Sequence, residues 1–249
     1  MLNLYSGTPG SGKSLHIAKL IYTWIRMYKC NVITVNMNIK SDYVYQKYGK
    51  KIPRKKRGVI YNFRDFEHIS PEFFYNYARK FHTKGKEHQT VIIIDEAQSF
   101  FNPTIVKEMN QYYKELKQKG IKIPYKDTYR NDWLKFFTQH RHLGFDICLV
   151  SQFDKLIDSQ FRCLFEYNYV HRKVNNYSVG FILSLLGISL FLCNQFWYGA
   201  RLRTGSNMFL YRRKYSKIYD SYKLFDEVLS KKDIKVNDKQ VMVDAGASL

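Results

Sequence analysis

The sequence is short of acidic residues and has no regular cysteine pattern. Asp and Glu number 21 against 41 Lys and Arg in 249 residues, which gives a formal net charge of +20 at pH 7. The four cysteines occur singly, without a CxxC pair, so neither a disulfide framework nor a cysteine zinc motif is predicted. They stand mostly in apolar runs, as reduced and buried cysteines do; they are Cys30, Cys148, Cys163 and Cys193.

The chain also lacks an obvious targeting or membrane-spanning segment. Its first residues, MLNLYSG, have neither the basic nor the long apolar region of a signal peptide, so we expect this part to stay in the cytoplasm. The uncharged segment Tyr177–Ala200 has a densely apolar core, Val179–Cys193, that is shorter than the ~20 residues of a spanning helix. Basic residues flank both of its ends, so the sequence leaves a spanning helix open.

Apolar and aromatic residues are plentiful. They make up 45% and 17% of the chain, enough for a packed core, so disorder is not expected. The strong basic charge favours a polyanionic partner: nucleic acid, nucleotide or an anionic membrane face. A general compositional bias towards Lys and Tyr explains the same charge without any partner, and both interpretations stay open.

Strand-like segments rich in β-branched residues alternate with segments of helical periodicity. Strands are predicted at Leu2–Tyr5, Asn31–Met37, Gly58–Phe63, Thr90–Gln98 and Phe145–Gln152, and helices at about Lys13–Tyr28 and Asp132–Gly144. Because the strands are apolar on both faces, the pattern predicts an α/β fold with a central, mostly parallel sheet and helices on both faces.

Two segments do not follow the alternation, and the pattern changes near the C-terminal end. Lys50–Gly58 is a basic loop, either simply solvated or in contact with phosphate or lipid, and Tyr112–Asp132 is a long polar connector. We predict a core at residues 1–174, a strand-rich extension packed on it at residues 175–228, and a polar tail at residues 229–249, with core and extension forming one domain.

The Gly-rich stretch after the first predicted strand matches the phosphate-binding pattern G-x-x-x-x-G-K-[ST]. Glycines let backbone N–H groups turn inward around an anion, and the following helix points its positive end at the same place. Lys13 is expected to reach the β- and γ-phosphates of ATP, and the Ser14 hydroxyl to ligate Mg²⁺. The competing interpretation is a turn that binds nothing. The matching residues are Gly7, Thr8, Pro9, Gly10, Ser11, Gly12, Lys13 and Ser14.

An acidic pair closes the most apolar of the predicted strands, in the text VIIIDEAQ. Asp95 is expected to hold Mg²⁺, and Glu96 to orient or deprotonate the attacking water. An acidic pair in this position is also a common helix start, because acidic residues favour helix N-termini. Together with the Gly-rich loop, the pair favours a catalytic interpretation.

The remaining catalytic candidates rest on weaker patterns. Gln152, at the end of the predicted strand after the acidic pair, is the candidate γ-phosphate sensor, although polar residues often end strands. Arg141 is the candidate arginine finger acting on a neighbouring subunit, with Arg162 and Arg172 equally available. His140 and His142 do not share a helix face, so a metal site is not predicted there.

With these residues in hand, the sequence resembles the zonula occludens toxin (Zot-like) family, which includes the assembly ATPases of filamentous phages. The resemblance rests on YSGTPGSGKS near the start, VIIIDEAQ, the stretch FFTQHRHLGFDICLVSQ, and YSKIYDSYKLFD. Together these segments span most of residues 1–225. The resemblance implies a P-loop NTPase of the additional-strand type that hydrolyses ATP with Mg²⁺ and powers export of single-stranded phage DNA.

The resemblance also implies partners and a location. We expect a homo-oligomeric ring that acts with phage DNA or with coat and assembly proteins, in the host cytoplasm and associated with the inner face of the inner membrane. The family's toxin activity belongs to an outer domain that this sequence does not show, so a toxin function is not expected. A plasmid or conjugation DNA-translocating ATPase, and a nucleotide-dependent scaffold that does not hydrolyse, remain as alternatives.

Overall fold

The computed structural model describes residues 1–63, 69–176 and 185–219. Met1–Tyr219 form one compact unit. The strands of its main sheet are β1 (Leu2–Ser6), β2 (Asn31–Val35), β5 (Ile60–Phe63), β6 (Thr90–Ile94), β7 (Phe145–Ser151), β8 (Tyr167–Lys173), β9 (Leu190–Trp197) and β10 (Leu202–Leu210). A separate small hairpin consists of β3 (Gln46–Lys47) and β4 (Lys50–Lys51).

The described helices vary from one turn to several. Those of ten residues or more are α1 (Lys13–Thr23), α3 (Pro71–Phe81), α5 (Pro103–Gln118) and α6 (Tyr129–Gln139). The short ones are α2 (Ser41–Tyr45), α4 (Gln98–Phe101), α7 (Ser159–Arg162) and α9 (Arg213–Ser216). Side-chain caps fix several starts: Ser70 Oγ accepts from the N–H of Phe73, and Asn102 accepts from the N–H of Thr104.

The strand order in the main sheet is β10-β9-β8-β1-β7-β6-β2-β5. The six strands from β8 to β5 are parallel, and β9 and β10 are antiparallel additions at the β8 edge. Strand β7 lies between β1, which precedes the Gly-rich loop, and β6, which precedes the acidic pair. This inserted strand is the additional strand that the resemblance implied, so the predicted fold class is confirmed.

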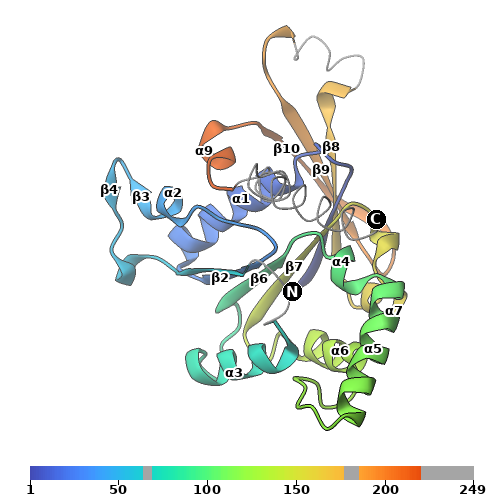
Figure 1. The fold of residues 1–249 in the computed structure, drawn as a ribbon. Coiled ribbons are helices and arrows are strands. Elements are labelled where there is room, and N and C mark those ends of the chain that lie inside the picture. The colour runs from blue at the N-terminus through green and yellow to red at the C-terminus, as the bar shows by residue number, and fades with distance from the viewer. Residues whose placement is uncertain (64–68, 177–184, 220–249) are drawn as a thin grey trace, which may run out of the picture. The chain divides into compact units, whose positions relative to one another are not determined.

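Both faces of the sheet are covered by helices, as the apolar strands predicted. Alternate residues of β6 face opposite sides. Ile92 and Ile94 pack in one core cluster with residues of α3 and α6, whereas Val91 and Ile93 pack in a second cluster with α1. Figure 1 shows α1 and α2 on one side of the strands and α3, α5 and α6 on the other. The first cluster is strongly aromatic, with Trp133 at its centre.

Some predicted boundaries were wrong. The polar connector expected at Tyr112–Asp132 is helical at both of its ends, because α5 continues to Gln118 and α6 begins at Tyr129. The text YYKELKQ contains no helix breaker, and Gly120 with φ +73° follows the end of the helix. The helix expected to run to Tyr28 ends at Thr23 and passes into a π-helical turn over Trp24–Tyr28.

The uncharged segment Tyr177–Ala200 lies partly outside the described residues, which omit 177–184. Within it, residues Leu190–Trp197 form strand β9, which pairs with β8 on one side and β10 on the other. Among the residues that the structure describes, no helix has both the length and the apolar character needed to cross a membrane. The predicted polar tail at residues 229–249 also falls outside the described part of the chain.

Candidate nucleotide site

The Gly-rich loop connects β1 to α1 and is shaped by glycines that no other residue replaces without strain. Gly7, Gly10 and Gly12 have φ values of +147°, +74° and +93°. A Cβ on Gly7 would lie 2.6 Å from the carbonyl O of His171, and one on Gly12 would lie 2.5 Å from the Phe191 ring. The loop therefore packs directly on β8 and β9, and the residues at both of its ends must be small.

Lys13 is the first residue of α1 and folds back over the loop. Its Nζ donates to the carbonyl O of Gly7 and, at 3.2 Å, to that of Thr8. Burial lowers the pKa of this ammonium, and the negative charges of Asp95 and Glu96 act against that shift. The loop lysine and the acidic pair, more than 80 residues apart in the sequence, are therefore close enough to interact electrostatically.

Asp95 follows the end of β6 and lies in an environment with little water. The residue keeps some exposure, but packing around its carboxyl raises the pKa to about 6, an effect partly offset by the backbone N–H of Glu96 and by Lys13. The N–H of Glu96 donates to Asp95 Oδ1 at 2.9 Å, and the N–H of Asp95 donates to the carbonyl O of Val35 at 3.0 Å. These bonds hold the carboxyl at the strand end that faces Lys13.

Glu96 adopts a left-handed backbone conformation with φ +48°, which is uncommon for a residue with a Cβ. The Nε2 of Gln98 donates to its carboxylate, and the N–H of Ala97 bonds to the carbonyl O of Val150 at 2.8 Å. The turn after β6 is thus fastened to β7, and the Glu96 carboxylate is held by a neighbouring amide. Sequence reasoning did not identify Gln98, although it stands two residues after Glu96 in the same motif.

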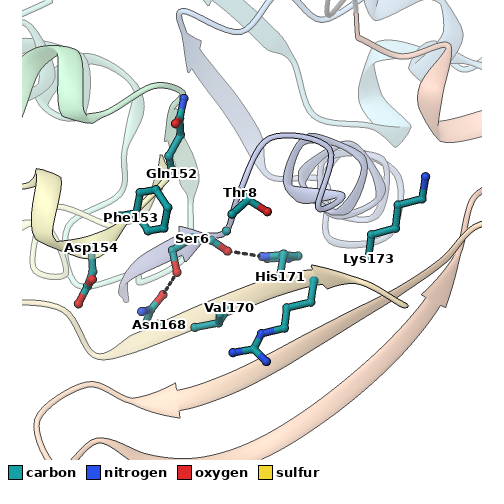
Figure 2. Close-up of a pocket in the computed structure, with 11 residues that line it drawn as sticks. Ser6, Thr8, Gln152, Phe153, Asp154, Asn168, Val170, His171 and Lys173 are labelled. Atoms are coloured by element: carbon teal, nitrogen blue, oxygen red, sulfur yellow. Dashed lines mark hydrogen bonds between the residues drawn. The ribbon is translucent and has the colours of Figure 1, made fainter. Parts of the chain in front are cut away.

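Gln152 directly follows β7 and lies beside the loop. Its carbonyl O accepts from the N–H of Gly7 at 3.1 Å. It also lines a pocket of about 380 Å³ together with Thr8, Asn168 and Arg172, among others. Figure 2 shows that the Gln152 side chain extends away from Asn168 and His171. The structure therefore brings Gln152 to the loop, just after the end of the strand that lies between β1 and β6. Its role as γ-phosphate sensor stays a prediction.

The three candidate arginine fingers occupy different places. Arg141 lies in the turn before β7, at the end of that strand opposite to Gln152, and its Nε pairs with Glu87 at 3.2 Å. It does not belong to the nucleotide site of its own chain, and its action on a neighbouring subunit stays a prediction. Arg162 ends α7. Only Arg172, of these three, lines the pocket beside the loop.

The loop and its surroundings fit a nucleoside triphosphate and Mg²⁺. Ser11 Oγ is buried without a hydrogen-bond partner, which is unusual for a hydroxyl that binds nothing. A phosphate oxygen would supply the missing partner. The Ser14 hydroxyl in the first turn of α1 and the Asp95 carboxyl are the hard oxygen donors that Mg²⁺ prefers.

Several residues of this site come from β8, a strand that the sequence analysis did not predict. Ser6 Oγ donates to Asn168 Oδ1 at 2.7 Å, and Figure 2 shows both side chains between β1 and β8. His171 Nδ1 lies 3.2 Å from the carbonyl O of Ser6. The alternation in YNYVHRK is a strand signal, but it does not reveal that this strand pairs with β1.

Comparison with known families gives one clear match. Residues 1–184 match the model of the family described as Zonular occludens toxin (Zot). No protein among the curated sequences matches the chain significantly.

Solved structures resemble the chain at low sequence identity. One structure, of an ATPase domain, is 10% identical with a TM-score of 0.50, covering 87% of this chain and 83% of that one. The N-terminal domain of zonular occludens toxin from Neisseria meningitidis is 18% identical with a TM-score of 0.46, covering 88% of this chain and 98% of that one. The genome packaging NTPase B204 from Sulfolobus turreted icosahedral virus 2 is 15% identical with a TM-score of 0.45, covering 85% and 95%. At such identities, likeness concerns the fold.

Proposed function

Because this chain belongs to the Zonular occludens toxin (Zot) family, we propose that it is an Mg²⁺-dependent ATPase that powers export of single-stranded filamentous-phage DNA. The observation that carries the ATPase part is the convergence of three motifs at adjacent strand ends. Lys13 follows β1, Gln152 follows β7 and Asp95 follows β6, in that spatial order. The phage part rests on family membership together with the net charge of +20.

The chain's own residues divide the work of hydrolysis. Backbone amides of the loop and Lys13 bind the phosphates. Ser14 and Asp95 would hold Mg²⁺, which would supply positive charge to the phosphates when bound. Glu96 accepts the proton of the attacking water, after its carboxylate leaves the amide of Gln98. Gln152 contacts the γ-phosphate, so that the end of β7 responds to whether the phosphate is present.

The proposal includes assembly into a homo-oligomeric ring on the cytoplasmic face of the host inner membrane. Hydrolysis of this class commonly uses an arginine from a neighbouring subunit, and Arg141 remains the proposed residue. Its exposed side chain lies before the first residue of β7, at the end of the strands opposite to the loop, so one subunit would present it to the site of the next.

The test measures phosphate release by the full chain, alone and with single-stranded DNA, for the native protein and Glu96→Gln. We expect turnover that rises with the DNA, and a loss of at least about 100-fold in the variant, the range of a general base. Glu96→Gln should still bind ATP, because the loop and Lys13 are unchanged. Native protein without turnover indicates a non-hydrolysing scaffold, and unchanged turnover in the variant removes Glu96 from the mechanism.

A further inference from the structure

Three side chains that commonly bind metals meet beneath the nucleotide loop, on the side away from Asp95. They are His16 of α1, His171 of β8 and Cys193 of β9, and their donor atoms lie within 4.8 Å of one another. The three residues are 7%, 1% and 3% exposed. Among the described residues this is the one group of three or more His, Cys, Asp or Glu side chains with such spacing.

The orientation of His171 is that of a metal ligand. Its Nδ1 lies 3.2 Å from the carbonyl O of Ser6, and Figure 2 shows the ring directed at that carbonyl. A carbonyl only accepts, so Nδ1 carries the proton and Nε2 keeps its lone pair. That lone pair faces His16, whose Nδ1 is 2.8 Å away. Metal-bound histidines usually donate their second ring nitrogen to such a backbone or carboxylate acceptor.

The donor types also suit a metal. A neutral imidazole keeps a lone pair on one ring nitrogen, and a cysteine sulfur binds a cation after it loses its proton. Aromatic rings of Tyr5 and Phe209 pack against the two histidines and limit water.

We propose that His16, His171 and Cys193 bind one zinc ion, at a site separate from the Mg²⁺ position of the nucleotide. Two imidazoles and one thiolate form a borderline-soft donor set that zinc accepts and Mg²⁺ does not. On binding, the Cys193 S–H bond breaks, a sulfur–zinc bond forms and one proton is released to solvent. The proton of His16 Nδ1 moves to Nε2, so Nδ1 gains the lone pair that binds zinc.

The ion would connect three elements that meet at the loop. His16 lies two residues after Ser14 in α1. His171 donates to the carbonyl O of Ser6, the last residue of β1. Cys193 belongs to β9, the strand whose Phe191 packs against Gly12. Three protein ligands leave the fourth tetrahedral position without a ligand from this group of side chains. Zinc would thus fix the loop to the strand-rich extension without contacting the nucleotide.

The test uses cobalt(II) as a spectroscopic substitute for zinc in the full chain, after treatment with a chelator. We expect one equivalent of Co²⁺ to give the visible absorption of a tetrahedral site and a near-ultraviolet sulfur-to-metal band, both removed by one equivalent of Zn²⁺. Cys193→Ser should lose the sulfur band, and Cys163→Ser, which removes an exposed thiol, should keep it.

Thermal unfolding gives an independent measurement in the same proteins. Zinc should raise the unfolding midpoint of the native chain and of Cys163→Ser, but not that of Cys193→Ser, because only a ligand bound to the folded state stabilises it. Absence of the cobalt bands from the native chain, or their persistence in Cys193→Ser, overturns the proposal. The three side chains would then form only a hydrogen-bonded histidine pair beside a buried thiol.

Discussion

At the scale of single residues, the nucleotide site depends on a few charged side chains held close to one another. Lys13, the first residue of α1, folds back onto the loop and donates to the carbonyl O atoms of Gly7 and Thr8. Phosphate oxygens are stronger acceptors than these carbonyls, because the resulting hydrogen bonds carry charge on both partners. Bound ATP should therefore draw the ammonium away from the loop backbone.

Replacing Lys13 with Ala should weaken ATP binding roughly 10-fold to 100-fold, the range expected when a charged hydrogen bond is lost. The measurement is equilibrium binding of a fluorescent ATP analogue with Mg²⁺ present. Lys19→Ala is the matched control, because it removes the same charge from a later position in α1. Equal affinities for the native chain and Lys13→Ala would contradict the assigned role.

Asp95 gives a prediction that depends on pH. Its pKa in the folded chain is about 6 against 3.8 for a free carboxyl, so the folded state prefers the protonated form. That stabilising preference is fully present below pH 3.8 and is lost as the pH rises through 6. Asp95→Asn, which keeps the shape without the charge, should gain stability relative to the native chain as pH rises.

The expected gain is on the order of 3 kcal/mol at pH 8 and smaller at pH 5. Denaturant unfolding of both proteins at several pH values measures the difference, and Asp42→Asn in the exposed first turn of α2 is the control variant. The same Asp95→Asn variant should lose Mg²⁺-dependent turnover. A stability difference that does not change with pH would show that the carboxyl is not held in a water-poor environment.

At the scale of elements, the loop, α1 and β9 form a tightly packed junction. Phe191 of β9 stacks on Phe209 of β10, with ring centroids 5.5 Å apart, and its ring lies against Gly12. The strand-rich extension therefore packs directly against the nucleotide loop, in addition to extending the sheet at its edge. A displacement of β9 would also displace the N-terminus of α1.

Gly12→Ala should destabilise the chain more than Gly10→Ala does. Both glycines have positive φ, so each alanine is strained by about 1–2 kcal/mol. A Cβ at Gly12 also meets the Phe191 ring, whereas one at Gly10 meets nothing within 4 Å. The measurement is the free energy of unfolding by denaturant. Equal losses in the two variants would show that Phe191 gives way without resistance.

At the scale of the whole molecule, part of the basic charge lies on one exposed hairpin and the turn that follows it. The hairpin β3–β4 and the turn after it present Lys50, Lys51 and Lys55 to solvent. Arg57, from the same basic loop, is committed to structure: its guanidinium lies 3.4 Å from the centre of the Tyr45 ring, and its Nε donates to Ile52. In this loop Arg57 thus stabilises the fold, whereas the three exposed lysines are available to bind anions.

Changing Lys50, Lys51 and Lys55 together to Gln should weaken binding of single-stranded DNA and reduce its dependence on salt. The logarithm of the affinity decreases linearly with the logarithm of the salt concentration. If all three lysines contact phosphates, this slope should become shallower by about 2 in the variant. The matched control changes Lys107, Lys114 and Lys117, three exposed lysines of α5. An unchanged slope in the hairpin variant would assign the charge of this loop to solvation alone.

Much of the fold and part of the site could be predicted from the sequence. Two parts of the site are local sequence patterns: the loop from Gly7 to Ser14 and the pair Asp95–Glu96. Their chemistry requires residues that are neighbours in the chain, so they can be recognised from the sequence. The strands β2, β6 and β7 were recognisable because burial on both faces demands continuous apolar text. The helical part of Tyr112–Asp132 was not predicted because most of its residues are polar. Few apolar residues mark the side of the helix that packs on the core.

The sequence by itself determined the local requirements: a phosphate loop, an acid at a buried strand end and apolar strands between helices. Only the tertiary structure decided that β7 separates β1 from β6, that Arg141 stands at the far end of the sheet, and that His16, His171 and Cys193 meet. The reason is that the local sequence determines backbone preference and burial. Contacts between distant segments depend on strand order and register, which arise only when the whole sheet is packed.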